Sequence, residues 1–417
     1  MASHVQSTPV LVALYLAAVF FPYIALLPLQ TDVQPYAVFL ATLLVIWNVD
    51  RQIPRLLYAL LIPPAAAIVF VILAHFSFYA VRALAGYWSL FAHATAGYLV
   101  FQRHRRAVVR WMSIASWVWL AVAIAQQLIA PDLTQFLIPN VSVNADRGVS
   151  SLATEPSFYG LYCLFLLLLA RVIAWEPIYF RVSLFTQILL LARSAMGALA
   201  LGILLATRAI AGLKRPQLIV LGLMAGATIM IVHELPEDLN VRAFFLLVTA
   251  MTDPSSLLTG DASVNARIDH IVYSILGFVE SFGAPHGFDA FGAYIGDLVA
   301  RNSDVIWLGQ DPEGMRIMSG YGGVLFELGW FGLVIPFVLT ACAWRRFKDD
   351  RAEFVAFAIT LNAVMFSAVQ ISLPLIGFIA GVSLAQSKSL ARGENPRIST
   401  DSAEFVSFAY PSHRKPT

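Results

Sequence analysis

The sequence predicts an all-α protein that crosses a membrane many times and carries one large loop on the outer side. Of its 417 residues, 59% are hydrophobic and only 12% are charged, and the mean hydropathy is +0.75. A soluble protein carries about 25% charged residues. The apolar residues also form long continuous runs without alternation, which favours spanning helices over a membrane β-barrel.

About twelve spans of roughly 20 residues each are expected. They fall near residues 8–28, 35–49, 56–77, 83–101, 108–129, 157–174, 178–192, 194–212, 217–233, 321–343, 353–369 and 373–387. The first run lacks a basic leader and a cleavage site, so it predicts a span and not a removed signal peptide.

The basic residues orient these spans, because cytoplasmic loops of membrane proteins carry an excess of Lys and Arg. With both termini in the cytoplasm, only seven of the 27 basic residues fall outside: Arg82, Arg147, Arg193, Arg242, Arg267, Arg301 and Arg316. The expected organisation is nine spans in residues 1–233 with an outer loop near 130–156, and then a large outer loop over 234–320. Three spans within 321–387 and a cytoplasmic tail over 388–417 follow.

The large outer loop contains a predicted amphipathic helix. Seven apolar residues keep one helical face: Ile268, Ile271, Val272, Ile275, Leu276, Val279 and Phe282. His270, Tyr273, Ser274 and Glu280 lie off that face. The pattern is typical of a helix that lies on or near the membrane surface.

Three outer arginines are the first candidates for a binding site, because an arginine kept at the bilayer surface away from the cytoplasm usually holds an anion. Arg147 stands eight residues before Glu155, which opens the sixth span together with Pro156 and Ser157. A proline and an acid suit the first turn of a helix. Two alternatives stay open: Glu155 only caps this helix, and Arg147 pairs only with Asp146 or Glu155.

Arg193 and Ser194 interrupt an apolar stretch from Leu184 to Leu205, at a turn between two predicted spans. An arginine at that depth is costly unless it is paired, so a binding role is the first interpretation. The alternative is a snorkelling arginine at a helix end.

Arg267 stands at the beginning of the predicted amphipathic helix. A helix N-terminus offers free backbone N–H groups and a positive dipole end, and arginine adds a bidentate fork. These features predict that the arginines hold a lipid-linked phosphate. The alternative for Arg267 is an ion pair with Asp269 or Asp261.

His286, in a Pro-His-Gly turn of the large loop, is a candidate acid–base group, and an ordinary loop histidine is the alternative. No pair of His, Asp or Glu residues has metal-ligand spacing, and Cys163 and Cys342 stand in separate predicted spans. The sequence contains no phosphate-binding P-loop, dinucleotide fingerprint or nucleophile elbow. Neither a metal nor a cofactor is therefore expected, and an ATP-driven pump is disfavoured.

Four pieces of the chain, in order, resemble the Wzy-type O-antigen and exopolysaccharide polymerases, within the superfamily that includes the O-antigen ligases. They are Arg147-Gly148 with the stretch 155–160, the stretch 193–197, Arg267 with the later stretch 285–288, and the glycine-rich stretch 322–332. The resemblance covers residues 144–335, about the middle half of the chain.

The resemblance implies a metal-independent glycosyltransferase in the inner membrane of a bacterium. Such an enzyme transfers a growing glycan from undecaprenyl pyrophosphate to a hydroxyl of the next lipid-linked repeat unit at the periplasmic face, with a chain-length regulator as a further partner. Arg147 and Arg267 match the loop arginines expected to hold the pyrophosphate, and Arg193 assists them. The catalytic candidates are Glu155 and His286, and an apolar groove between spans would admit the lipid tail.

Two other functions remain open from the sequence. The ligase branch often has a histidine just before the glycine-rich span, where this chain has Ser319, Gly320 and Tyr321, and this departure favours a polymerase. A transporter or flippase for lipid-linked or anionic solutes should instead pair its charges near the middle of the membrane. No nucleic-acid partner is expected.

Overall fold

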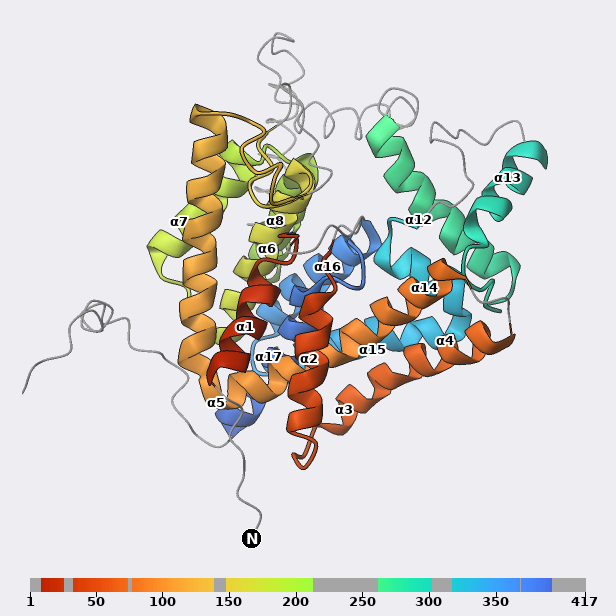
Figure 1. Cartoon of the computed structure of the whole chain (residues 1–417), viewed down its shortest axis with the longest axis horizontal. Helices are drawn as coiled ribbons and strands as arrows, with labels where there is room; N and C mark the ends of the chain where they lie inside the picture. Colours follow the sequence, from red (N-terminus) through yellow and green to blue (C-terminus); the bar gives the residue numbers. More distant parts are fainter. Residues whose placement is uncertain are drawn as a thin grey trace, which may run out of the picture.

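The computed structural model describes residues 9–25, 33–73, 77–138, 148–212, 262–301, 317–367 and 369–391, and within these ranges the chain is all-helical (Figure 1). The first half contains α1 (Pro9–Phe20), α2 (Tyr36–Trp47), α3 (Arg55–Tyr58), η1 (Ala59–Leu61), α4 (Ile62–Leu73), α5 (Phe78–Leu128), α6 (Pro156–Ile173), α7 (Ile178–Thr186), η2 (Gln187–Leu191) and α8 (Ala195–Gly212). The second half contains α12 (Ala262–Glu280), α13 (Phe291–Arg301), α14 (Gly320–Leu328), η4 (Gly329–Leu333), α15 (Val334–Phe347), α16 (Arg351–Ser367) and α17 (Pro374–Ala391).

Helix α5 is bent into two arms. It is 51 residues long, and at 1.5 Å per residue it measures about 76 Å, more than twice the hydrocarbon thickness of a bilayer. The backbone leaves the helical region at His104 (φ −122°, ψ 37°), between the predicted spans 83–101 and 108–129. Figure 1 shows the two arms meeting at a corner, one upright and one running obliquely above α3 and α4. The expected connection between two spans is therefore a kink within one helix.

The first arm of α5 packs against α17 with the two backbones in close approach. A Cβ at Gly381 would lie 1.9 Å from the carbonyl oxygen of Ala94, and a Cβ at Gly97 would lie 2.9 Å from that of Phe378. No larger residue fits at Gly381 unless the helices move apart. Glycines on both helices thus allow the tight packing that drives association in membrane bundles.

Helix α6 lies at the centre of the bundle. Each of its residues is buried except Ser157 and Phe158 in its first turn. The ring of Trp119 stacks on Tyr162 at 4.0 Å between centroids, and both side chains donate to the carbonyl oxygen of Phe20. The rest of the protein therefore surrounds α6 and leaves only its first turn open to a ligand.

Among the described residues, four helical segments are long and apolar enough to cross a membrane: Arg55–Leu73, Phe78–Leu128, Pro156–Ile173 and Gly320–Phe347. Helices occupy eleven of the twelve predicted spans. The remaining span, 217–233, lies outside the described residues. Several of these helices are too short to span, since the 12 residues of α2 extend only about 18 Å. The protein is thus an α-helical membrane protein, but the structure does not support about twelve spans.

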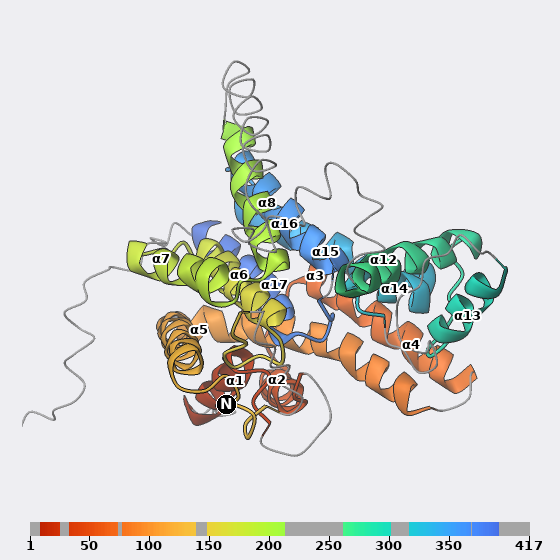
Figure 2. The same ribbon diagram turned by 90° about the horizontal axis from the view of Figure 1, so that it is seen from above.

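The predicted amphipathic helix corresponds to α12. Its polar face packs against the rest of the protein, and its apolar face points outward. The buried residues of α12 include Asn265, Asp269, His270 and Ser274. None of the seven residues on the predicted apolar face is buried, and Val272 and Val279 are exposed. The polar face of α12 packs against α14, which is adjacent to it in both views (Figure 2). An outward apolar face is what a helix in contact with lipid requires.

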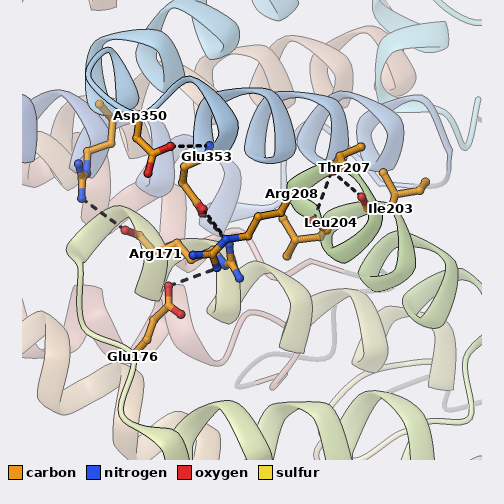
Figure 3. A network of polar contacts seen from close by, with 9 residues as sticks. Arg171, Glu176, Ile203, Leu204, Thr207, Arg208, Asp350 and Glu353 are labelled. Atoms are coloured by element: carbon orange, nitrogen blue, oxygen red, sulfur yellow. Dashed lines mark hydrogen bonds and ion pairs between the residues drawn. The ribbon is translucent and has the colours of Figure 1, made fainter. Parts of the chain in front are cut away.

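A buried ion-pair network joins the far end of α6 to α8 and α16 (Figure 3). Arg171 Nη1 lies 2.6 Å from Glu353 Oε1, and Arg208 Nε lies 3.3 Å from Glu353 Oε2. Arg171 Nε is also 3.8 Å from Glu176 Oε1. Glu353 thus lies between two arginines from different helices and connects three elements that are distant in sequence.

Two more arginines satisfy the last carbonyl groups of α6. Arg105 donates to the carbonyl oxygen of Ile173 at 3.1 Å, and Arg346 donates to that of Val172 at 2.6 Å. The final carbonyls of a helix have no partner within the helix, and cations stabilise its negative dipole end. Basic residues therefore fix this end of α6 in the bundle.

Candidate functional site

The candidate site begins at the N-terminus of α6. Glu155 is the N-cap residue, with φ −142° and ψ 153°, and Pro156 occupies the first helical position. The Glu155 side chain forms no capping hydrogen bond, although the residue stands at the positive end of the helix dipole. Instead, Ser157 Oγ donates to Glu155 Oε2 at 3.0 Å. The carboxylate is therefore directed away from the helix backbone.

Arg267 reaches this carboxylate from α12. Its Nη2 atom lies 3.7 Å from Glu155 Oε2 and donates to Ser157 Oγ at 3.3 Å. The structure thus brings together two predicted site residues that are more than 100 positions apart. The ion pair that Arg267 makes within the described part of the chain is with Glu155 and not with Asp269. Asp261 lies outside the described residues.

The Glu155 side chain is 37% exposed and the Arg267 side chain 21% exposed. The pair is therefore neither sealed in the core nor free in solvent. An ion pair this long and partly hydrated contributes little stability by itself. An incoming anion can compete for the guanidinium without breaking a strong buried contact.

Arg193 lies in a turn that packs against the first turns of α6. Its backbone has a positive φ of 46°, its side chain is exposed, and its Nε donates to the carbonyl oxygen of Leu190 at 3.3 Å. Among the described residues it makes no ion pair. A Cβ at Gly160 of α6 would lie 2.9 Å from the Cβ of Ser194. Arg193 precedes Ser194, so its backbone lies close to the first turns of α6.

Arg147 lies outside the described residues, but the residues that follow it are placed. The backbone N–H of Val149 donates to the carbonyl oxygen of Leu191 at 3.0 Å. A Cβ at Gly148 would lie 2.1 Å from the carbonyl oxygen of Ala192, so only glycine fits there. The segment that follows Arg147 therefore runs beside the turn that carries Arg193.

His286 belongs to a different part of the structure. Its Nε2 atom is 2.9 Å from the carbonyl oxygen of Gly277, and its ring stacks on Phe326 at 4.2 Å between centroids. A nitrogen facing a carbonyl oxygen carries the proton and donates. Gly277 is ten residues along α12 from Arg267, about 15 Å. His286 is thus held away from the pair of Glu155 and Arg267, and it fastens its loop to α12 and α14.

An apolar pocket begins at the first turn of α6. Its empty volume is about 330 Å³, including the solvent at its mouth, and it is lined by Tyr23, Phe158, Leu161, Tyr162, Val369 and Leu373, among others. Phe158 follows Ser157 directly, so this pocket adjoins the candidate site. Most of its lining is apolar or aromatic.

A larger polar pocket lies between the first arm of α5, α14 and the segment 369–371. Its empty volume is about 620 Å³, including the solvent at its mouth, and its walls include Arg82, Tyr87, Asp289, Glu327 and Gln370. None of these five residues was assigned a role from the sequence. The signal was present at Glu327, because an ionisable residue within a predicted span indicates a functional role by default.

A polar cluster lies beneath α12, next to the candidate site. The Nδ1 atom of His270 accepts from the backbone N–H of Met318 at 3.1 Å, and burial lowers the pKa of this imidazole to about 4. Burial also raises the pKa of Asp269 from 3.8 to about 6, while the side chain of Asn265 opposes that rise. His270 is therefore neutral at pH 7. Burial makes the charged form of Asp269 less stable in the folded protein than in the unfolded chain.

The described residues contain no cluster of three or more His, Cys, Asp or Glu residues that could hold a metal ion. Cys163 and Cys342 are buried and free. No family model matches the chain, and a search of curated proteins finds none similar to it.

Proposed function

We propose that this protein is a polysaccharide polymerase of the bacterial inner membrane, a metal-independent glycosyltransferase that uses polyprenyl pyrophosphate as the carrier. The observation that carries the proposal is the meeting of Arg267 with Glu155 and Ser157 at the open first turn of an otherwise buried helix. A cation, a hydroxyl group and a helix N-terminus together form a site for a phosphate group. Arg193 supplies an exposed guanidinium on the turn that packs against α6, and the segment after Arg147 runs beside this turn.

The reaction needs little more than stabilisation of negative charge. A hydroxyl oxygen of the next repeat unit attacks the anomeric carbon of the growing chain. The bond from that carbon to the pyrophosphate oxygen breaks, and polyprenyl pyrophosphate leaves. Fixed guanidinium groups and helix N–H groups stabilise the developing charge without a metal.

Glu155 is the proposed base for the acceptor hydroxyl. In the absence of substrate its carboxylate pairs with Arg267. A pyrophosphate with more negative charge competes for that guanidinium and leaves Glu155 free to accept the hydroxyl proton. His286 is the weaker of the two candidates, because its Nε2 proton already bonds to the carbonyl oxygen of Gly277.

The rest of the arrangement supports the same chemistry. The apolar pocket beside Phe158 suits the polyprenyl tail. In the proposed orientation both termini are cytoplasmic and α12 belongs to the periplasmic loop. A ligase of the same superfamily would use the same donor and differ only in its acceptor, and a chain-length regulator is a further proposed partner.

A transporter is the functional alternative from another class. The buried pair of Arg171 and Glu353 is the feature that favours it, since transporters pair charges within their helices. Yet Arg171 lies in the last turn of α6, beside the basic residues Arg105 and Arg346. This position favours a structural role at a helix end.

The proposal is tested by glycan length in producing cells that carry Arg267→Ala. Loss of the guanidinium should leave single repeat units in place of long polymer, because the leaving group loses its main cation. Arg301→Ala is the matched control, since Arg301 is exposed on α13 and pairs only with Asp297 among the described residues. The amount of each variant in the membrane is measured alongside.

Normal polymer with Arg267→Ala at normal protein levels would contradict the proposed function. Loss of even single capped units would point to a ligase or a flippase.

A further inference from the structure

The polar pocket between α5 and α14 has the composition of a sugar-binding site. Its walls combine two carboxylates, a guanidinium and an amide with aromatic rings: Asp289, Glu327, Arg82, Gln370, Tyr79 and Phe288. Planar polar groups pair with the adjacent hydroxyls of a sugar, and aromatic faces cover its C–H surface.

Glu327 is the most firmly oriented of these groups. The hydroxyl group of Tyr87 donates to its Oε2 atom, although the two residues lie on different helices. Its backbone carbonyl accepts from the N–H of Gly287 at 3.2 Å, which fixes the neighbouring loop. A carboxylate on an apolar helix is costly, so its retention at a pocket wall indicates a binding role.

Gly320 and Gly323 form part of the pocket wall next to Glu327, and Gly323 is the one that leaves space. A Cβ at Gly323 would meet only Ile317, another wall residue, at 3.6 Å, which is ordinary contact. The fold therefore does not require glycine at 323. The missing side chain keeps the pocket open, and a larger residue there would fill it.

Gln370 connects the polar pocket to the candidate donor site. It lines both the polar pocket and the apolar pocket that begins at Phe158. Phe158 in turn follows Ser157, which contacts Arg267. A lipid-linked glycan at the first turn of α6 and a second glycan in the polar pocket would thus share one wall.

We propose that this pocket binds the sugar of the acceptor repeat unit, with Glu327, oriented by Tyr87, accepting hydrogen bonds from its hydroxyl groups. The proposal rests on the proposed function for the identity of the acceptor. The pocket itself requires only an uncharged or cationic oligosaccharide that bears free hydroxyls.

The test measures binding of a free oligosaccharide to the full-length protein in detergent. The probe is the repeat-unit oligosaccharide that mild acid releases from the lipid-linked units of cells that lack the protein. It carries no pyrophosphate and no lipid. Saturation-transfer NMR or calorimetry gives its dissociation constant.

Glu327→Gln should weaken binding by roughly tenfold or more, because a charge-assisted hydrogen bond is lost. Gly323→Leu should abolish binding by filling the pocket. Arg267→Ala should leave binding unchanged, because the probe lacks the group that Arg267 is proposed to hold. Glu280→Gln is the matched control, since Glu280 also accepts from a tyrosine, Tyr294 at 2.8 Å, but lies outside the pocket.

Equal binding by the wild type and Glu327→Gln, or no saturable binding by the wild type, would overturn the assignment of the pocket. That result is separate from failure of the proposed function, which appears as normal polymer in Arg267→Ala cells. Tyr87→Phe should weaken binding in the wild type but not further in Glu327→Gln, because Tyr87 acts by orienting the carboxylate. Additive losses from the two substitutions would contradict this role for Tyr87.

Discussion

Asp269 shows how one buried side chain couples the stability of α12 to pH. It is 5% exposed, and burial raises the pKa of its carboxyl to about 6. The folded protein therefore holds this proton more tightly than the unfolded chain does. The stabilisation is present below about pH 4 and is lost as the pH rises from about 4 to about 6.

Asp269→Asn should accordingly make the protein more stable than the wild type at pH 8 and not at pH 4. The gain has an upper limit of roughly 3 kcal/mol, the value of a pKa rise from 3.8 to about 6. Thermal unfolding in detergent at a series of pH values measures it. Asp297→Asn, at a site 70% exposed on α13, should show no such pH-dependent gain.

The neighbouring histidine gives the same experiment a second readout. The lowered pKa of His270 means that its stabilising contribution is present above about pH 6.5 and is lost as the pH falls towards about 4. In the wild type this trend opposes that of Asp269. In Asp269→Asn it acts alone, so the variant should lose stability more steeply on acidification. A pH profile parallel to that of the wild type would contradict this account.

The candidate residues could be predicted from the sequence only as separate positions. The sequence indicates Arg267 and Glu155 as candidates because an unpaired charge near the bilayer is energetically unfavourable and usually has a function. Their contact could not be predicted, since it depends on the placement of α12 beside the first turn of α6. The position of Glu327 within a predicted span was a signal for that residue alone. Its contact with Tyr87 could not be predicted, because only the packing of α5 against α14 joins the two.

At the scale of elements, α6 is held at one end by the ion-pair network and is open at the other. Glu353→Gln should lower the free energy of unfolding by about 3 kcal/mol, because buried Arg171 loses its nearer carboxylate and keeps only Glu176 at 3.8 Å. Chemical denaturation in detergent measures the change. Asp297→Asn breaks the exposed pair with Arg301 and should have no measurable effect. Equal effects of the two substitutions would contradict the structural role of the network.

The direction in which the apolar face of α12 points could not be predicted from the sequence. The spacing of its apolar residues correctly predicts a helix and an apolar face. In a soluble protein that face packs inward, but in a membrane protein it can face lipid. The exposed Val272 and Val279 and the buried Asp269 and His270 show that the apolar face of α12 points outward. Composition alone cannot distinguish the two.

At the scale of the whole molecule, the apolar runs predicted where the helices form but not how they cross the membrane. A run of 12 residues and a run of 20 both read as apolar, although only the second spans about 30 Å. The kink of α5 at His104 was likewise hidden, because the basic residues around it resemble an ordinary loop. The arrangement of the helices around α6 depends on contacts between distant segments, such as Gly381 with Ala94.

Reconstitution of the purified protein tests the central claim most directly. The protein is placed in liposomes with lipid-linked repeat units and EDTA, without nucleotide or any other protein. The account predicts glycan chains of increasing length, with one polyprenyl pyrophosphate released for each new linkage, and loss of both with Arg267→Ala. Repeat units that cross the membrane unchanged, or chain growth that requires a divalent metal, would contradict it.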